Sequence, residues 1–183
     1  MLDAKMVADL ITATRGLLGF VMIWLGITQG EEALPAVIIL MLLDWTGDFV
    51  DGTIAHRSRH PRHTWIGDSD LYFDLFVSLC LGVYLFAAGF VSLGFVGLYL
   101  FGWTLILWHF GLDRNLLMLV QAPIYLYFIV ISLQVNPDLG NWLVIWVLLA
   151  AAINWRRFTH EIIPRFIDGM RSMWNGNGKP HSP

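Results

Sequence analysis

Carboxylates cluster in one short part of an otherwise apolar sequence. The segment from residue 44 to residue 74 contains six of the fourteen acidic residues: Asp44, Asp48, Asp51, Asp68, Asp70 and Asp74. Apolar sequence flanks this segment on both sides. Carboxylates beside membrane-like sequence are costly unless a cation, a partner or water lies next to them. The chemistry to expect in this segment is therefore cation binding, or a reaction at charged groups.

The spacing of these carboxylates predicts two pairs on two helices. Asp48 and Asp51 lie three positions apart, and Asp70 and Asp74 lie four apart, so each pair shares one helix face. Four carboxylates at one depth repel one another strongly unless a cation lies between them. Carboxylate oxygens suit hard ions such as Mg²⁺, Mn²⁺ or Ca²⁺. We therefore predict a site for a divalent ion at these four residues.

Other residues near the pairs have simpler interpretations beside a functional one. Asp44 falls on the helix face of Asp48, but Asp44 and Asp68 could each be a solvated charge near a helix end. Gly52 and Ala55 are small, so a ligand could approach the helix backbone beside the ion.

The composition predicts an all-α integral membrane protein. The chain has 183 residues, of which 57% are hydrophobic and only 14% charged, against roughly 25% charged in a typical soluble domain. Its mean hydropathy is +0.63 and its formal net charge is −3, so we expect no nucleic-acid partner. Cys80 is the only cysteine, which excludes a disulfide framework within the chain. We expect a single domain over residues 1–172 and a disordered tail over 173–183.

Six apolar segments must position the carboxylates. About 20 residues of helix cross the roughly 30 Å hydrocarbon core of a membrane. By this measure the sequence predicts spans at about 7–28, 33–57, 66–89, 91–110, 114–134 and 140–160. The second span ends acidic and the third begins acidic, so the carboxylate pairs lie at adjoining ends of two neighbouring spans.

The distribution of charge between the loops predicts the orientation. The connections near 28–33, 89–91 and 134–140 share one side and contain acidic residues but no Lys or Arg. All eleven basic residues fall on the other side, which the positive-inside rule makes cytoplasmic. Both termini and the polar site would then face the cytoplasm in a multi-pass protein of a bacterial or archaeal cell membrane. The mixed basic and apolar segment 156–172 is expected at the anionic inner leaflet, against membrane lipids.

The spacing of the carboxylates and of the small residues beside them resembles the signature of a known family. The family of CDP-alcohol phosphatidyltransferases (class I) has the signature D-x2-D-G-x2-A-R, then eight residues, then G-x3-D-x3-D. This chain has Asp48-x2-Asp51-Gly52-x2-Ala55 and later Asp70-x3-Asp74. Many members also have N-x2-T-x2-R in the first span, where this chain has Asp9-x2-Thr12-x2-Arg15.

Three positions depart from the family pattern. His56 stands where the family has Arg, and Arg57 follows it. The interval from Asp51 to Asp70 is one residue longer than in the signature, and Gly67 precedes Asp70 by three positions rather than four. A one-residue insertion in the loop RSRHPRHTW would account for the spacing without changing either helix face.

The resemblance implies a fold, a reaction and a set of roles. It implies six transmembrane helices and a cytoplasm-facing site, in which Asp48, Asp51, Asp70 and Asp74 bind Mg²⁺ or Mn²⁺. A CDP-linked lipid, typically CDP-diacylglycerol, would bind there, and Asp74 would deprotonate the hydroxyl of a small alcohol acceptor, with CMP leaving. The residues that the resemblance assigns to the CDP-lipid are Gly52, Ala55, His56, Arg57, Thr12 and Arg15. Family members are often dimers, so a homodimer is a candidate assembly.

The acceptor and two other functions stay open. A phosphorylated acceptor would need a basic pocket, for which Arg114, Arg156 and Arg157 are candidates, but these residues also fit ordinary anchoring at the cytoplasmic face. The histidines of the loop after residue 55 could bind a transition metal or simply face anionic headgroups. Two alternatives to the enzyme are a catalytically impaired relative with a lipid-nucleotide binding role, and a divalent-cation transporter, which would usually bind ions nearer the membrane midplane.

Overall fold

The structure is a computed structural model, and it describes residues 4–57, 70–111, 113–155, 159–160 and 163–174. Within these ranges the side chains of residues 4–13, 51–57, 70, 71, 114, 165, 166, 170 and 172–174 are not described. The described part of the chain is almost entirely helical and contains no strand. Its elements are α1 (Ala4–Gln29), η1 (Gly30–Ala33), α2 (Leu34–Arg57), α4 (Asp70–Ala87), α5 (Leu93–Phe110), α6 (Arg114–Val135), α7 (Pro137–Ile153) and α9 (Ile163–Trp174).

These helices follow the six apolar segments that the sequence predicts. The sixth segment differs most from its helix, because α7 begins at Pro137 rather than near residue 140 and ends at Ile153 rather than near 160. Pro137 suits the first turn, where a missing N–H leaves no hydrogen bond unmade. The side chain of Asn136 accepts a hydrogen bond from the Leu139 N–H at 3.2 Å and so caps the same turn. In the third segment α4 begins at Asp70, and residues 66–69 lie outside the described part.

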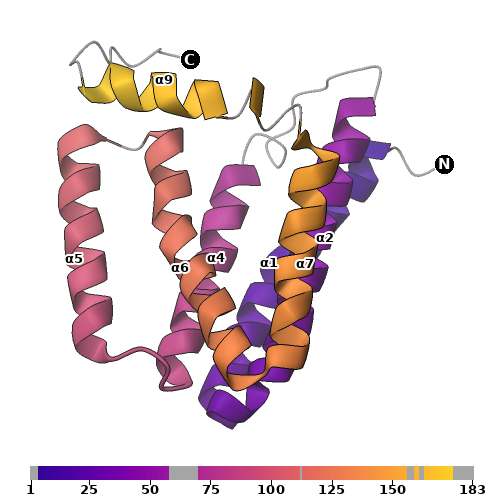
Figure 1. Cartoon of the computed structure of the whole chain (residues 1–183), viewed down its shortest axis with the longest axis vertical. Helices are drawn as coiled ribbons and strands as arrows, with labels where there is room; N and C mark the ends of the chain where they lie inside the picture. The colour runs from indigo at the N-terminus through magenta and orange to yellow at the C-terminus, as the bar shows by residue number, and fades with distance from the viewer. Residues whose placement is uncertain (1–3, 58–69, 112, 156–158, 161–162, 175–183) are drawn as a thin grey trace.

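The helices α1, α2 and α4–α7 run alternately up and down, as Figure 1 shows. The turn through η1, the turn after α4 and the turn at Asn136 all lie at one end of the bundle. Gly30 and Gly89 in two of these turns have φ values of 61° and 80°, which glycine adopts readily. The helix α9 lies across the opposite end, where Gly169 is so close to Asn115 of α6 that a Cβ atom would lie 2.1 Å from the Asn115 Nδ2 atom.

The core lies where α1, α2 and α4 pack together. Its fully buried side chains include Met22 of α1, Ile38 of α2 and Tyr84 of α4. Phe128 of α6 and Leu143 of α7 extend this core on the other side of α4 and α2. The carboxylate-bearing helices α2 and α4 are therefore fixed against α1 by continuous apolar packing.

The outer surface of the bundle is apolar, as expected of a protein surrounded by lipid. None of the residues of α5 is buried, and Leu98 and Trp108 of this helix are 71% and 89% exposed. Three helical stretches are long and apolar enough to cross a membrane: Thr14–Val50, Leu93–Phe110 and Asn115–Val135. The first of these turns back on itself at η1 (Figure 1), and Tyr72–Ala87 and Pro137–Ile153 form shorter apolar helices.

Candidate functional site

A line of glycines on α1 allows α4 to approach it closely. Added Cβ atoms at Gly19 and Gly26 would lie 3.0 Å from Cys80 Sγ and 3.2 Å from the Tyr84 Cα atom, respectively. A Cβ atom added at Gly16, one turn before Gly19, would lie 3.6 Å from the ring of Phe73. Small residues of this kind let helix backbones pack against each other inside a membrane. The close packing brings Arg15, the neighbour of Gly16, next to the first turns of α4.

Arg15 joins three carboxylates from two other helices. Its Nε donates a hydrogen bond to Asp44 Oδ1 at 3.0 Å, and Nη1 donates to Asp48 Oδ1 at 2.9 Å, both on α2. Its Nη2 donates to Asp74 Oδ1 on α4 at 2.5 Å. The structure therefore brings together Asp48 and Asp74, which the sequence assigned to one site, around a residue that the family resemblance assigned to the CDP-lipid.

Exposure increases from the inside of this cluster to its outside. The side chains of Asp44 and Arg15 are 1% and 4% exposed, whereas those of Asp74 and Asp48 are 28% and 45% exposed. The ion pair of Asp44 and Arg15 is thus buried within the bundle, and the other two carboxylates can be reached from outside it. Buried charges of this kind occur when they are paired and hydrogen-bonded.

For the other predicted site residues, the structure describes the position in a helix and not the side chain. Asp51, Gly52, Ala55, His56 and Arg57 occupy the last turns of α2, and Asp70 is the first residue of α4. Thr12 lies on α1, one turn before Arg15. The side chains of these residues lie outside the described part, so their shared site stays a prediction. Arg114 begins α6, and Arg156 and Arg157 fall outside the described residues.

The described side chains can be compared with the ligands that a metal ion would need. In that set, no three His, Cys, Asp or Glu side chains form a group that could bind a metal ion. Two of the four predicted ligands, Asp51 and Asp70, have side chains outside the set. The donor chemistry does fit a hard divalent ion, because the three carboxylates are oxygen donors and exceed the single guanidinium by two formal charges.

Sequence reasoning underestimated Asp44 and missed Tyr125. Asp44 is four residues before Asp48 and so lies on the same helix face, but spacing alone does not reveal depth. Tyr125 of α6 directs its hydroxyl toward the Asp74 carbonyl oxygen at 3.5 Å, and its ring packs edge-on against Trp45 of α2. The ring centroids of Trp45 and Trp146 of α7 lie 5.7 Å apart. The Trp146 Nε1 donates a hydrogen bond to Thr46 Oγ1 at 3.0 Å. Aromatic side chains from α2, α6 and α7, namely Trp45, Tyr125 and Trp146, therefore pack beside the carboxylates.

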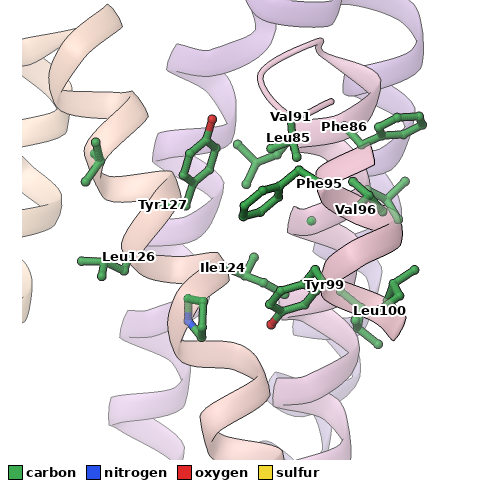
Figure 2. A pocket seen from close by; sticks show the side chains of 15 residues that line it. Leu85, Phe86, Val91, Phe95, Val96, Tyr99, Leu100, Ile124, Leu126 and Tyr127 are labelled. Carbon is green, nitrogen blue, oxygen red and sulfur yellow. The ribbon is translucent and has the colours of Figure 1, made fainter. Parts of the chain in front are cut away.

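A second feature is an apolar groove between α4, α5 and α6, with a volume of about 600 Å³. Figure 2 shows that Phe95 of α5 extends toward Tyr127 of α6, and Tyr99 of α5 toward Ile124 of α6. The two tyrosine hydroxyls that line the groove donate to backbone carbonyls, Tyr99 to Val120 and Tyr127 to Phe90. The groove walls are therefore apolar, and their hydroxyls already have acceptors within the protein.

The groove begins on the same helix as the carboxylate cluster. Its α4 residues run from Leu79 to Phe86. At 1.5 Å per residue these lie roughly 7 to 18 Å beyond Asp74 along the helix axis. A molecule with a charged head and an apolar tail could contact both features at once.

Comparison with known proteins adds no relative to this description. No protein-family model, curated protein or solved structure matches the chain.

Proposed function

We propose that this chain is an integral-membrane phosphatidyltransferase. In this proposal it transfers a phosphatidyl group from a CDP-linked lipid, CDP-diacylglycerol foremost, to the hydroxyl of a small alcohol, and CMP is released. The observation that carries the proposal is the convergence of Asp48 and Asp74, from two different helices, on one guanidinium. The same two residues belong to the two halves of the Asp signature in the sequence.

The proposed reaction uses the carboxylates in two ways. Asp48, Asp51, Asp70 and Asp74 would bind Mg²⁺ or Mn²⁺, which neutralises charge on transferred phosphoryl groups. Asp74 would accept the proton of the acceptor hydroxyl, whose oxygen then bonds to the phosphorus attached to the lipid. The bond from that phosphorus to the CMP oxygen breaks, and its electron pair leaves with CMP. The partial exposure of Asp74 supports this role, because an acceptor can approach it from outside the bundle.

The proposed membrane arrangement has six spans. Counting α1 and α2 separately, and adding the shorter apolar helices α4 and α7 to α5 and α6, gives that number. Arg57 ends α2 and Arg114 begins α6 at the end of the bundle nearer the carboxylates, and we propose that this end is the cytoplasmic face. The two termini would lie on the same side.

The apolar groove supports a lipid substrate rather than a soluble one. Its volume falls within the roughly 300–1,000 Å³ of typical ligand pockets, and its apolar walls suit an acyl chain. The groove runs along α4 away from Asp74, in the direction that the tail of a lipid would take from a head at the carboxylates. For the acceptor, Arg114, Arg156 and Arg157 stay the proposed contacts of a phosphate group.

The experiment that tests the function is an assay of CMP release. The purified full chain in nanodiscs would receive CDP-diacylglycerol with serine, glycerol 3-phosphate, inositol or inositol phosphate. Each mixture would be run with Mg²⁺, with Mn²⁺ and with a chelator. We expect metal-dependent CMP release with one of these acceptors and a matching phospholipid product.

Two other results would replace this proposal. Binding of CDP-diacylglycerol without CMP release under any condition would favour the catalytically impaired relative, for which His56 is the motivating residue. Divalent-ion flux in liposomes without CMP release would favour a cation transporter. The position of Asp74 near the start of α4 makes the transporter the weaker alternative, because such proteins usually bind ions in the middle of the membrane.

A further inference from the structure

Asp44 is the most buried member of the carboxylate cluster and lies outside the family signature. Its side chain is 1% exposed, and its Oδ1 accepts the hydrogen bond from Arg15 Nε at 3.0 Å. Its Oδ2 is also buried and has no hydrogen-bond partner among the described residues. The reaction proposed above assigns nothing to this residue, although burying a carboxylate is costly.

The geometry of the guanidinium shows what Asp44 can do. The group is planar, and its N–H bonds point in fixed directions, so fixing the Nε atom also fixes where the two terminal nitrogens point. Asp44 binds Nε, whereas Nη1 and Nη2 donate to Asp48 and Asp74. The contact with Asp44 therefore determines how Arg15 presents its outer face to carboxylates from α2 and α4.

Stability alone is a weak reason for this buried pair. Replacing both members of a buried ion pair with apolar residues is often neutral or stabilising, because neither charge must then be desolvated. The pair of Arg15 and Asp44 also carries no net formal charge. Its effect on the outer carboxylates must therefore arise from the position of the guanidinium and not from an added charge.

We propose that Asp44 is a positioning residue, which acts through Arg15 to set the spacing between Asp48 and Asp74 and thus between the ion ligands of α2 and α4. This inference rests on the proposed metal-dependent function. It differs from the roles that the sequence assigns, because neither Asp44 nor its contact with Arg15 forms part of the Asp signature. The ligands of metals are commonly oriented by neighbouring groups in this way.

A charge-matched double variant separates position from charge. Arg15→Met combined with Asp44→Leu removes one positive and one negative group, so the formal charge of the cluster is unchanged. Binding of Mn²⁺ would be followed by electron paramagnetic resonance on the full chain in phosphatidylcholine nanodiscs, whose zwitterionic lipid adds no net negative charge. The control is Ser132→Ala, which changes a fully buried polar side chain on a different helix, α6.

We expect the double variant to fold and to bind Mn²⁺ about tenfold more weakly, as losses of outer-shell partners typically do. The Mn²⁺ concentration for half-maximal CMP release should rise by a similar factor. The KM for CDP-diacylglycerol is compared in Asp44→Asn, which keeps Arg15, and should change little there at saturating Mn²⁺. Asp44→Asn keeps an acceptor for Nε and should lose less affinity than the double variant. If the double variant fails to fold, Arg15→Gln combined with Asp44→Asn decides the matter, because it too leaves the formal charge of the cluster unchanged, and we expect a weakening of about tenfold.

The outcomes distinguish this inference from the function on which it rests. A folded double variant with the Mn²⁺ affinity and CMP release of the unmodified protein overturns the positioning role and leaves the proposed function intact. Unchanged Mn²⁺ binding by the combination of Arg15→Gln and Asp44→Asn has the same meaning if the first double variant does not fold. An unmodified protein that neither binds Mn²⁺ nor releases CMP rejects both.

Discussion

Asp48 of α2 and Asp74 of α4 accept hydrogen bonds from the two terminal nitrogens of the same guanidinium, at 2.9 and 2.5 Å. Two carboxylates from different helices are thereby kept close together at one end of the bundle. The sequence signature separates them by a loop of basic and histidine residues, but in space they share one partner.

The carboxylates themselves are the first test. Changing Asp74 to Asn should lower the rate of CMP release by about a hundredfold or more, because the side chain can no longer accept a proton. Changing Asp48 to Asn should mainly raise the metal concentration that the reaction needs. Asp138→Asn, the same change at the opposite end of the bundle, should leave both quantities unaltered. Normal metal-dependent turnover in Asp74→Asn would contradict the assignment of the base.

Arg15 should contribute strongly to stability. Arg15→Met leaves the Asp44 carboxylate buried without its partner, and breaking a buried pair in this way costs about 3–5 kcal/mol. The measurement is the free energy of unfolding in mixed detergent micelles. Arg171→Met on α9 removes an exposed arginine and should cost no more than about 1 kcal/mol. If the two variants lose the same free energy of unfolding, the buried pair of Arg15 and Asp44 contributes no more to stability than an exposed arginine does.

Part of this site could be predicted from the sequence. Asp48 and Asp74, which the sequence assigned to one site, both accept hydrogen bonds from Arg15, and the helices occur where the apolar segments predict them. The places of Asp51 and Asp70 in this site stay predictions. The depth of Asp44 could not be predicted, because helical spacing gives direction around an axis and not distance from the surface. The pairing of Asp44 with Arg15 depends on which helices pack together, and that is a property of the whole bundle.

The same reason explains why the groove was not foreseen. Nothing in the sequence distinguishes Phe95 or Ile124 from other apolar membrane residues. In the structure they line a groove between α4, α5 and α6, and none of the residues of α5 is buried. Whether two apolar helix faces touch or leave a space depends on the angle and separation of the helices, which hydropathy does not encode.

The glycines of α1 provide a test of the packing behind the site. Gly26→Ala would place a Cβ atom 3.2 Å from the Tyr84 Cα atom, so α1 and α4 would have to separate slightly. We expect a loss of roughly 1–3 kcal/mol in the free energy of unfolding, as for other overpacked contacts. Gly97→Ala on α5 has open space around its Cβ position and should be neutral or slightly stabilising. The prediction is wrong if Gly26→Ala behaves like Gly97→Ala.

Filling the groove should affect lipid substrates according to their chain length. Gly82 of α4 lines the groove, and a Cβ atom there would lie in ordinary contact with Ile124 at 3.7 Å. The larger side chain of Gly82→Leu would occupy space proposed for an acyl chain. We expect the KM for a long-chain CDP-diacylglycerol to rise about tenfold, equivalent to about 1.4 kcal/mol, with little change for a short-chain analogue.

The control for the groove is a leucine at a glycine that does not line it. Gly97→Leu adds the same side chain to α5, at a position with no neighbouring atom near its Cβ. This variant should retain the KM of the unmodified protein for both lipids. If Gly82→Leu raises the KM for the short-chain and long-chain lipids equally, the change acts on the carboxylate end of α4 and not on an acyl chain. If neither KM changes while the variant stays folded, the lipid tail lies elsewhere on the bundle.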